Sequence, residues 1–264
     1  MKFYVSCDME GIAGVTLREQ LVRGEPLYEE ARRQLTLETN AVTVALLDAG
    51  ATRIIVKDAH GSGFNFIPEL LHPGADYVMG ATRVENRFPG LDKTFDGALL
   101  IGYHAMGGTP LAVRDHTMTS QGWQSLRLNG RLIGEIGLDG LLFGLQGVPV
   151  LFVSGDDKTC AEAANELPGV VAYETKTALG RHAALMKAPQ RVRSELQAAV
   201  RRAIENENRP KPLRLEGPYE LTIRFLHTEQ ADARRYDGIT AERTDGLTAV
   251  YKADHLTGLL AAAF

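Results

Sequence analysis

The chain begins with an apolar segment that runs straight into two acids, KFYVSCDMEG at residues 2–11. Residues 2–7 are typical of a short, largely buried strand, and Asp8 and Glu10 follow it directly. If the strand alternation continues, the two carboxylates point to the same face. Ligands collect at the carboxyl ends of strands in open α/β sheets, where an uncompensated carboxylate is costly to bury. The segment therefore predicts a polar site at the edge of a sheet.

Two further apolar segments end in the same way. Residues 53–57 precede Asp58 and His60, and residues 98–103 precede His104. Each side chain alone has a plainer explanation, since acids cap helices and single histidines are often structural. Three strands that end in Asp, Glu or His favour a metal site when taken together. A set of imidazoles and carboxylates suits zinc or manganese better than magnesium.

Two more residues extend the candidate site. Glu135 lies at the entry to an expected helix, where the helix dipole favours a glutamate, but it can also supply a fifth ligand. Five ligands suit two metals that share a bridging carboxylate better than they suit one zinc. His116 follows His104 by twelve residues and is either an ordinary loop histidine or a proton shuttle.

The remaining pattern predicts an α/β fold. A helical pattern over residues 26–47 separates the strands at 2–7 and 53–57, which makes a βαβ unit and a parallel sheet. An Asn-Gly pair at 129–130 predicts a hairpin, and a polar, proline-containing stretch at 206–212 is the best candidate linker. We expect a largely parallel central sheet flanked by helices in a metal-binding catalytic core (1–208), and a smaller α+β C-terminal lobe (209–264).

Composition excludes several classes of protein. Of the 264 residues, 44% are hydrophobic and 23% are charged, as in ordinary globular proteins. The net charge of −4 gives no basic surface for nucleic acid, and no apolar run is long enough to cross a membrane. Two cysteines are too few for a disulfide framework, which favours a reducing compartment and a cytoplasmic protein.

An ordered set of motifs resembles the bacterial zinc D-aminopeptidases, a family whose type member is encoded with dipeptide-transport genes. The matching motifs are Asp8-Met9-Glu10-Gly11-Ile12, Asp58-Ala59-His60, Gly102-Tyr103-His104-Ala105, His116-Thr117-Met118, Gly134-Glu135-Ile136-Gly137 and Val153-Ser154-Gly155-Asp156-Asp157. The chain departs from the pattern at Cys7 and Asp139 and keeps every ligand position.

The resemblance implies a function and an assembly. It implies two zinc ions per subunit, with Asp8 bridging them and further ligands at Glu10, His60, His104 and Glu135. It also implies that His116 is an additional catalytic residue, and that the subunits form a homodecameric ring. The expected activity is removal of the N-terminal residue, a D-amino acid, from short peptides.

Two other functions stay open at this stage. A magnesium-dependent phosphatase or phosphotransferase would use an acid pair after the first strand together with Asp156 and Asp157, but it leaves the strand-end histidines unexplained. A non-catalytic, metal-stabilised peptide-binding protein would have a closed coordination sphere with no position for water.

Overall fold

The central sheet is built from seven strands in the order β3-β2-β1-β4-β7-β8-β9. The computed structural model describes residues 1–264. The strands of this sheet are β1 (Lys2–Cys7), β2 (Arg53–Asp58), β3 (Asp76–Val78), β4 (Gly97–Ile101), β7 (Val150–Asp156), β8 (Val171–Gly180) and β9 (Ala183–Met186). All neighbours pair in parallel except β9, which runs antiparallel to β8. The predicted α/β class with a largely parallel sheet is confirmed.

The strand order reverses beside β1. From β1 the chain moves outward to β2 and β3 on one side, and then from β4 to β7 and β8 on the other. Cys7 at the end of β1 pairs with both Asp58 and Ile101, so β1, β2 and β4 end at the same edge of the sheet. Such a reversal leaves a crevice outside the carboxyl ends of the strands, where α/β proteins bind their ligands.

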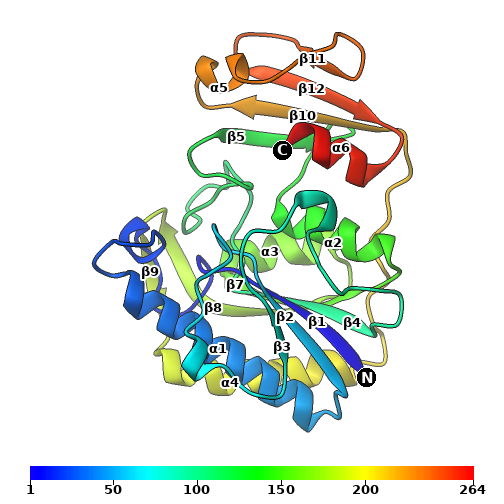
Figure 1. The fold of residues 1–264 in the computed structure, drawn as a ribbon. Helices are drawn as coiled ribbons and strands as arrows, with labels where there is room; N and C mark the ends of the chain where they lie inside the picture. The colour runs from blue at the N-terminus through cyan, green and yellow to red at the C-terminus, as the bar shows by residue number, and fades with distance from the viewer.

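Helices cover both faces of the central sheet (Figure 1). On one face α1 (Tyr28–Asp48) packs beside α4 (Pro189–Glu205), and their apolar residues join those of β1 in one core. On the other face lie α2 (Glu135–Leu145) and α3 (Asp157–Glu166). Asp156 caps α3 by accepting a hydrogen bond from the backbone N–H of Thr159 at 2.7 Å. Three 3-10 helices complete this part of the chain: Arg18–Gln20, Pro68–Leu70 and Val84–Asn86.

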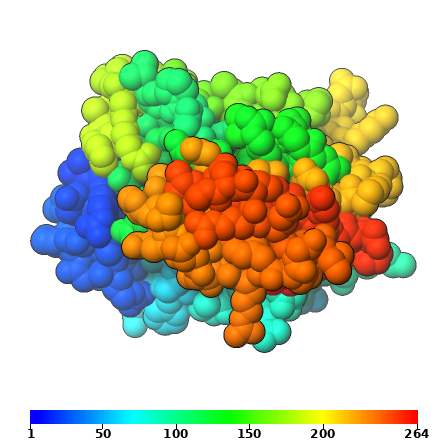
Figure 2. All heavy atoms as spheres, turned by 90° about the horizontal axis from the view of Figure 1, so that it is seen from above, coloured from blue at the N-terminus to red at the C-terminus, as the bar shows by residue number.

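A second, antiparallel sheet lies above α2 and α3 (Figure 1). Its order is β11-β12-β10-β5-β6, with β5 (Trp123–Leu128), β6 (Arg131–Leu132), β10 (Tyr219–Phe225), β11 (Ala241–Arg243) and β12 (Thr248–Ala253). Two helices accompany it, α5 (Thr228–Asp232) and α6 (Leu256–Ala263). Seen from above, its C-terminal strands, in orange and red, cover the middle of that face (Figure 2).

The hairpin β5–β6 links the two parts of the chain. Asn129 and Gly130 form its turn with φ of 49° and 79°, as the Asn-Gly pair predicted. Because β5 pairs with β10, strands from beyond residue 209 share a sheet with a hairpin from the first 208 residues. The division of the chain at residue 208 stays a prediction. None of the helices combines the length and the apolar character needed to span a bilayer.

Candidate metal centre

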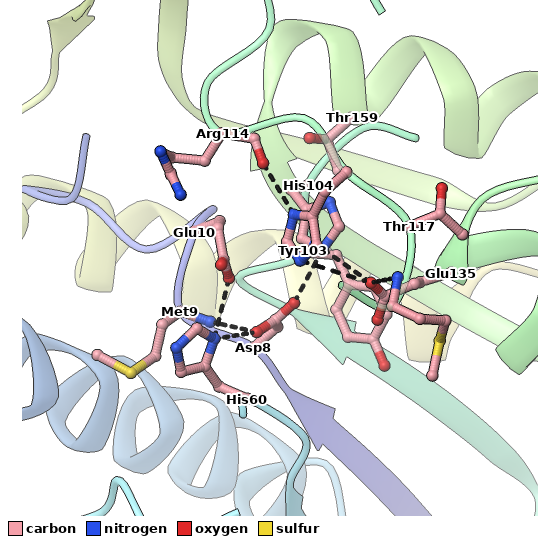
Figure 3. A network of polar contacts seen from close by, with 12 residues as sticks. Asp8, Met9, Glu10, His60, Tyr103, His104, Arg114, Thr117, Glu135 and Thr159 are labelled. Carbon is pink, nitrogen blue, oxygen red and sulfur yellow. Dashed lines mark hydrogen bonds and ion pairs between the residues drawn. The ribbon is translucent and has the colours of Figure 1, made fainter. Parts of the chain in front are cut away.

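The six predicted site residues come together at the edge where β1, β2 and β4 end (Figure 3). Strand β1 ends at Cys7, so Asp8 and Glu10 lie in the turn after the strand and not within it. Both carboxylates nevertheless reach the same cluster, and each residue is only 4% exposed. The other members are His60 after β2, His104 after β4, His116 from the following loop, and Glu135, the first residue of α2.

Asp8 occupies the centre of the cluster. Its Oδ1 atom lies 2.9 Å from Nδ1 of His60, and its Oδ2 atom lies 3.3 Å from Nε2 of His104. Glu10 contacts His60 on one side, with 3.2 Å between Oε2 and Nδ1. Glu135 contacts His104 on the other side, with 3.2 Å between Oε1 and Nε2. The cluster therefore consists of two acid–imidazole groups that share Asp8.

Each imidazole is held through its outer nitrogen by a backbone carbonyl. Nε2 of His60 pairs with the carbonyl of Leu21 at 2.9 Å, and Nδ1 of His104 with that of Ala105 at 3.0 Å. Nδ1 of His116 pairs with the carbonyl of Arg114 at 2.9 Å. A carbonyl can only accept, so these nitrogens carry the protons, and the inner nitrogen of a neutral ring turns its lone pair towards the carboxylates. This is how proteins orient metal-binding histidines.

The cluster is strongly polarised. Burial raises the pKa of Asp8, but the adjacent imidazoles of His104 and His60 outweigh burial and hold that pKa well below its usual value. Against burial, His104 likewise lowers the pKa of Glu135 to about 2. Burial opposes protonation of His60 and His104, yet the neighbouring acids raise the pKa of both rings well above the ordinary value. The acids therefore stay ionised, and they favour protonation of the His60 and His104 rings.

The residues fit a pair of divalent cations. Nε2 of His104 is buried between two carboxylates but makes no hydrogen bond to either. A metal ion in place of the protons would satisfy this nitrogen and the acids together. Two sets of three ligand atoms lie within 4.8 Å of one another: Asp8, Glu10 and His104 in one, and His104, His116 and Glu135 in the other. The donor set is carboxylate and imidazole, as zinc prefers.

His116 lies at the edge of this arrangement. Its ring stacks on that of His104, with 3.9 Å between centroids and 15° between planes. Its Nε2 atom is 3.8 Å from Oε1 of Glu135. Burial, followed by the charge of His104, lowers the pKa of His116, so the ring is neutral near pH 7. A neutral imidazole at this position can accept a proton or bind a metal.

Three supporting side chains were not predicted from the sequence. Arg87 pairs with Asp139 at 2.6 Å and lies 3.4 Å from Oε2 of Glu135, which explains why an acid is stable at position 139. Lys176 of β8 donates to three backbone carbonyls of residues 10–15, one of them Ile12 at 2.9 Å. Glu162 of α3 accepts from the N–H of Met106, next to the His104 turn, at 2.6 Å. Each contact joins segments far apart in the chain, so no local motif marks it.

The cluster opens into a cavity of about 260 Å³. Asp8, Glu10, His60, His116 and Glu135 form part of its wall. The rest of the wall includes residues 118–121, the loop around Leu21, and two arginines, Arg18 and Arg114. A small molecule in this cavity would contact the acids and imidazoles directly.

Comparison with known proteins gives consistent results. A family model described as D-aminopeptidase, peptidase M55, matches residues 1–263. The D-aminopeptidase of Bacillus subtilis (strain 168) is 35% identical over 232 residues, which are 88% of this chain and 84% of that protein. The solved structure of the Zn-dependent D-aminopeptidase DppA from Bacillus subtilis, described as a self-compartmentalizing protease, matches with a TM-score of 0.93 and 33% identity, over 100% of this chain and 95% of that one. The resemblance predicted from the motifs is confirmed.

Proposed function

Since this chain belongs to the D-aminopeptidase family of M55 peptidases, and is therefore a metal-dependent aminopeptidase, we propose that it releases N-terminal D-residues from short peptides with two zinc ions per subunit. Asp8 would bridge the ions, and the remaining ligands would be Glu10, His60, His104 and Glu135. The observation that carries the proposal is the pair of acid–imidazole groups that share Asp8. Bound zinc would supply an activated water and a polarised substrate carbonyl.

The protein's own residues would complete the reaction. His116 takes the attacking water's proton on Nε2, because its Nδ1 position is already engaged by the carbonyl of Arg114. The same nitrogen then gives a proton to the leaving amine as the peptide bond breaks. The substrate's α-amine would bind in its neutral form at the metal centre, which would place the N-terminal peptide bond beside His116. The lowered pKa of His116 suits a group that must begin the cycle neutral.

The two alternative functions have less support. Magnesium prefers oxygen ligands and water, whereas three imidazoles turn towards this centre. A closed structural metal site would leave no room for water or substrate, whereas this cluster forms the wall of a cavity of about 260 Å³. Neither alternative accounts for the family membership.

Metal stoichiometry and peptide hydrolysis together test the proposal. The purified chain should bind two zinc ions per subunit by elemental analysis, and the loaded enzyme should hydrolyse D-Ala-D-Ala much faster than L-Ala-L-Ala. One ion per chain with full activity would contradict the binuclear site. Equal rates on the two peptides would contradict the preference for D-residues. A phosphate-ester substrate serves as the negative control.

We also propose that the chain assembles into a homodecameric ring in the cytoplasm. The similar enzyme from Bacillus subtilis is described as self-compartmentalizing, which supports a closed assembly here. The two cysteines, Cys7 and Cys160, are free, in keeping with a reducing compartment. Light scattering on the eluted protein should give ten times the chain mass of 28.8 kDa. A monomer at micromolar concentration would refute the ring.

A further inference from the structure

Arg114 is a buried arginine without a partner. The residue is only 8% exposed, yet its guanidinium makes no hydrogen bond or ion pair, and its Nε atom is fully enclosed. Burial, with the nearby charge of Arg181 adding to it, lowers the pKa of this side chain. A buried guanidinium is stable only when an acid or several acceptors compensate it. The structure leaves this requirement unmet within the chain.

The other arginines beside the site are compensated. Arg87 is mostly buried, with 11% of its side chain exposed, and it pairs with Asp139 through two nitrogens, at 2.6 and 3.1 Å. Arg18 lies in the same cavity wall as Arg114 but is half exposed and pairs with Glu25 at 3.1 Å. Only Arg114 combines burial, a position on the cavity and a free guanidinium. This contrast indicates that its partner comes from outside the chain.

The backbone holds Arg114 firmly against the site. Its φ is 52°, in the left-handed region that non-glycine residues rarely adopt. Its N–H donates to the carbonyl of Arg181 at 3.1 Å, and its own carbonyl accepts from His116. The preceding residue, Val113, is tied to Asp156 at 2.8 Å. Figure 3 shows the guanidinium on the Glu10 side of the cluster. Unusual backbone held by several contacts is common where a side chain must be aimed.

From these observations we infer that Arg114 binds the C-terminal carboxylate of the substrate and so restricts the enzyme to very short peptides with a free C-terminus. A guanidinium binds a planar carboxylate through two parallel hydrogen bonds. A dipeptide has its amine at one end and its carboxylate at the other. The cavity has a matching group for each end, the metal centre for the amine and the guanidinium of Arg114 on the wall for the carboxylate. This inference rests on the proposed peptidase function.

The size of the cavity agrees with a small substrate. Its volume of about 260 Å³ lies just below the roughly 300–1,000 Å³ typical of small-molecule sites. An arginine and a metal centre in one such cavity can contact both ends of a peptide only when the peptide is short. Longer peptides would place their carboxylate outside and leave Arg114 buried without compensation. The enzyme should therefore select substrates that are both short and end in a free C-terminal carboxylate.

The test compares D-Ala-D-Ala with its C-terminal amide in the zinc-loaded enzyme. The free dipeptide should have a kcat/KM roughly 10- to 100-fold higher, the range expected for a charge-assisted bidentate contact. In Arg114→Gln this ratio should fall close to one through a rise in KM for the free peptide, and Arg114→Lys should restore part of it. The matched control Arg18→Gln should keep the wild-type ratio. Metal content and melting temperature confirm that each variant is folded.

Other outcomes would overturn the inference. A wild-type ratio near one would show that the terminal carboxylate is not recognised. An equal fall in kcat for both peptides in Arg114→Gln would place Arg114 at the reacting carbonyl. If the ratio of kcat/KM for the free dipeptide to that for the amide fell to one in Arg18→Gln, Arg18 would be the residue that binds the carboxylate. Calorimetry on metal-free protein gives a readout without turnover, in which the free dipeptide should bind at least tenfold more tightly than the amide. Hydrolysis of neither peptide would refute the proposed function, and the calorimetric comparison would still decide the role of Arg114.

Discussion

Gly11 packs directly against the carbonyl of Tyr103, so closely that a Cβ atom at position 11 would lie 2.1 Å from Tyr103 O. The N–H of Gly11 donates to the carbonyl of Gly102 at 2.8 Å. This contact joins the turn after β1, which carries Glu10, to the turn after β4, which carries His104. The distance between two predicted ligands therefore depends on a position where only glycine fits.

We predict that Gly11→Ala disrupts the centre. The added methyl would meet backbone atoms of residues 102, 103 and 155, and these cannot move aside as a flexible side chain can. Overpacking costs about 1–3 kcal/mol where the core can relax, and we expect about 3 kcal/mol or more here. Urea unfolding and bound zinc per chain measure the two effects. Gly258→Ala is the control: its methyl would enter open space on α6 and should be neutral or slightly stabilising. Wild-type stability and zinc content in Gly11→Ala would contradict the argument.

Replacing Asp8 should remove both metals. Asp8 contacts His60 and His104 with separate oxygens, so Asp8→Ala takes an acceptor from each half of the cluster. We expect bound zinc to fall to well below one ion per chain and turnover to disappear. Elemental analysis and hydrolysis of D-Ala-D-Ala measure these effects, with the exposed Asp92→Ala as the matched acid control. An active, metal-free Asp8→Ala enzyme would refute the metal mechanism.

His116→Gln should separate catalysis from metal binding. If His116 transfers protons, kcat should fall by about 10²–10⁴-fold while zinc content stays at the wild-type value. The geometry also permits His116 to be a ligand, because it lies with His104 and Glu135 in one possible metal set. A variant that loses one zinc ion per chain would assign that role instead. Zinc content and kcat should therefore be measured on the same preparation.

Several residues of the candidate metal centre could be predicted from the sequence because they follow the ends of strands. Asp8, His60 and His104 could be predicted together since parallel strands end at a common edge. Glu135, at the entry to a helix, and His116, twelve residues after His104, were added as candidates from their positions in the sequence, and the family motifs contain both. The βαβ unit and the Asn-Gly hairpin were local patterns, and the structure confirms both. The strand predicted at residues 2–7 is confirmed, but the strand alternation assumed for Asp8 and Glu10 is wrong, because β1 ends at Cys7.

The supports of the site could not be predicted in the same way. Arg87 is 48 residues from Glu135, and Lys176 is 166 residues from Glu10. Such contacts depend on which strands become neighbours in the sheet, and local sequence patterns do not predict the strand order. Arg114 stands two residues before His116 in a loop without a recognisable motif. What distinguishes it, burial without a partner and a left-handed backbone, appears only in the structure.

A buried acid and a buried base each bind the backbone of the turn that follows Glu10. Glu38 of α1 accepts a hydrogen bond from the N–H of Ala13 at 2.8 Å through Oε1, while its Oε2 atom has no partner. Lys176 donates to carbonyls of the same turn. Burial raises the pKa of Glu38 to about 7, even though the N–H of Ala13 and the charge of Lys176 favour its ionised form. Ionisation of Glu38 therefore lowers the free energy of unfolding of the protein.

This arrangement makes stability depend on pH in a defined direction. The folded pKa of Glu38 is about 7 and its ordinary value is 4.5, so the unfolded chain loses this proton first as the pH rises. The stabilising contribution of protonated Glu38 is complete below pH 4.5 and is lost as the pH rises through 7. Glu38→Gln keeps an acceptor for Ala13 and removes the titration. As the pH rises from about 5 to 7.5, the free energy of unfolding of the variant, measured with urea, should increase by about 2 kcal/mol relative to that of the wild type. Glu30→Gln, an exposed change on the same helix, should show no such trend. Parallel stability curves for wild type and Glu38→Gln across this range would mean that Glu38 is ionised at little cost.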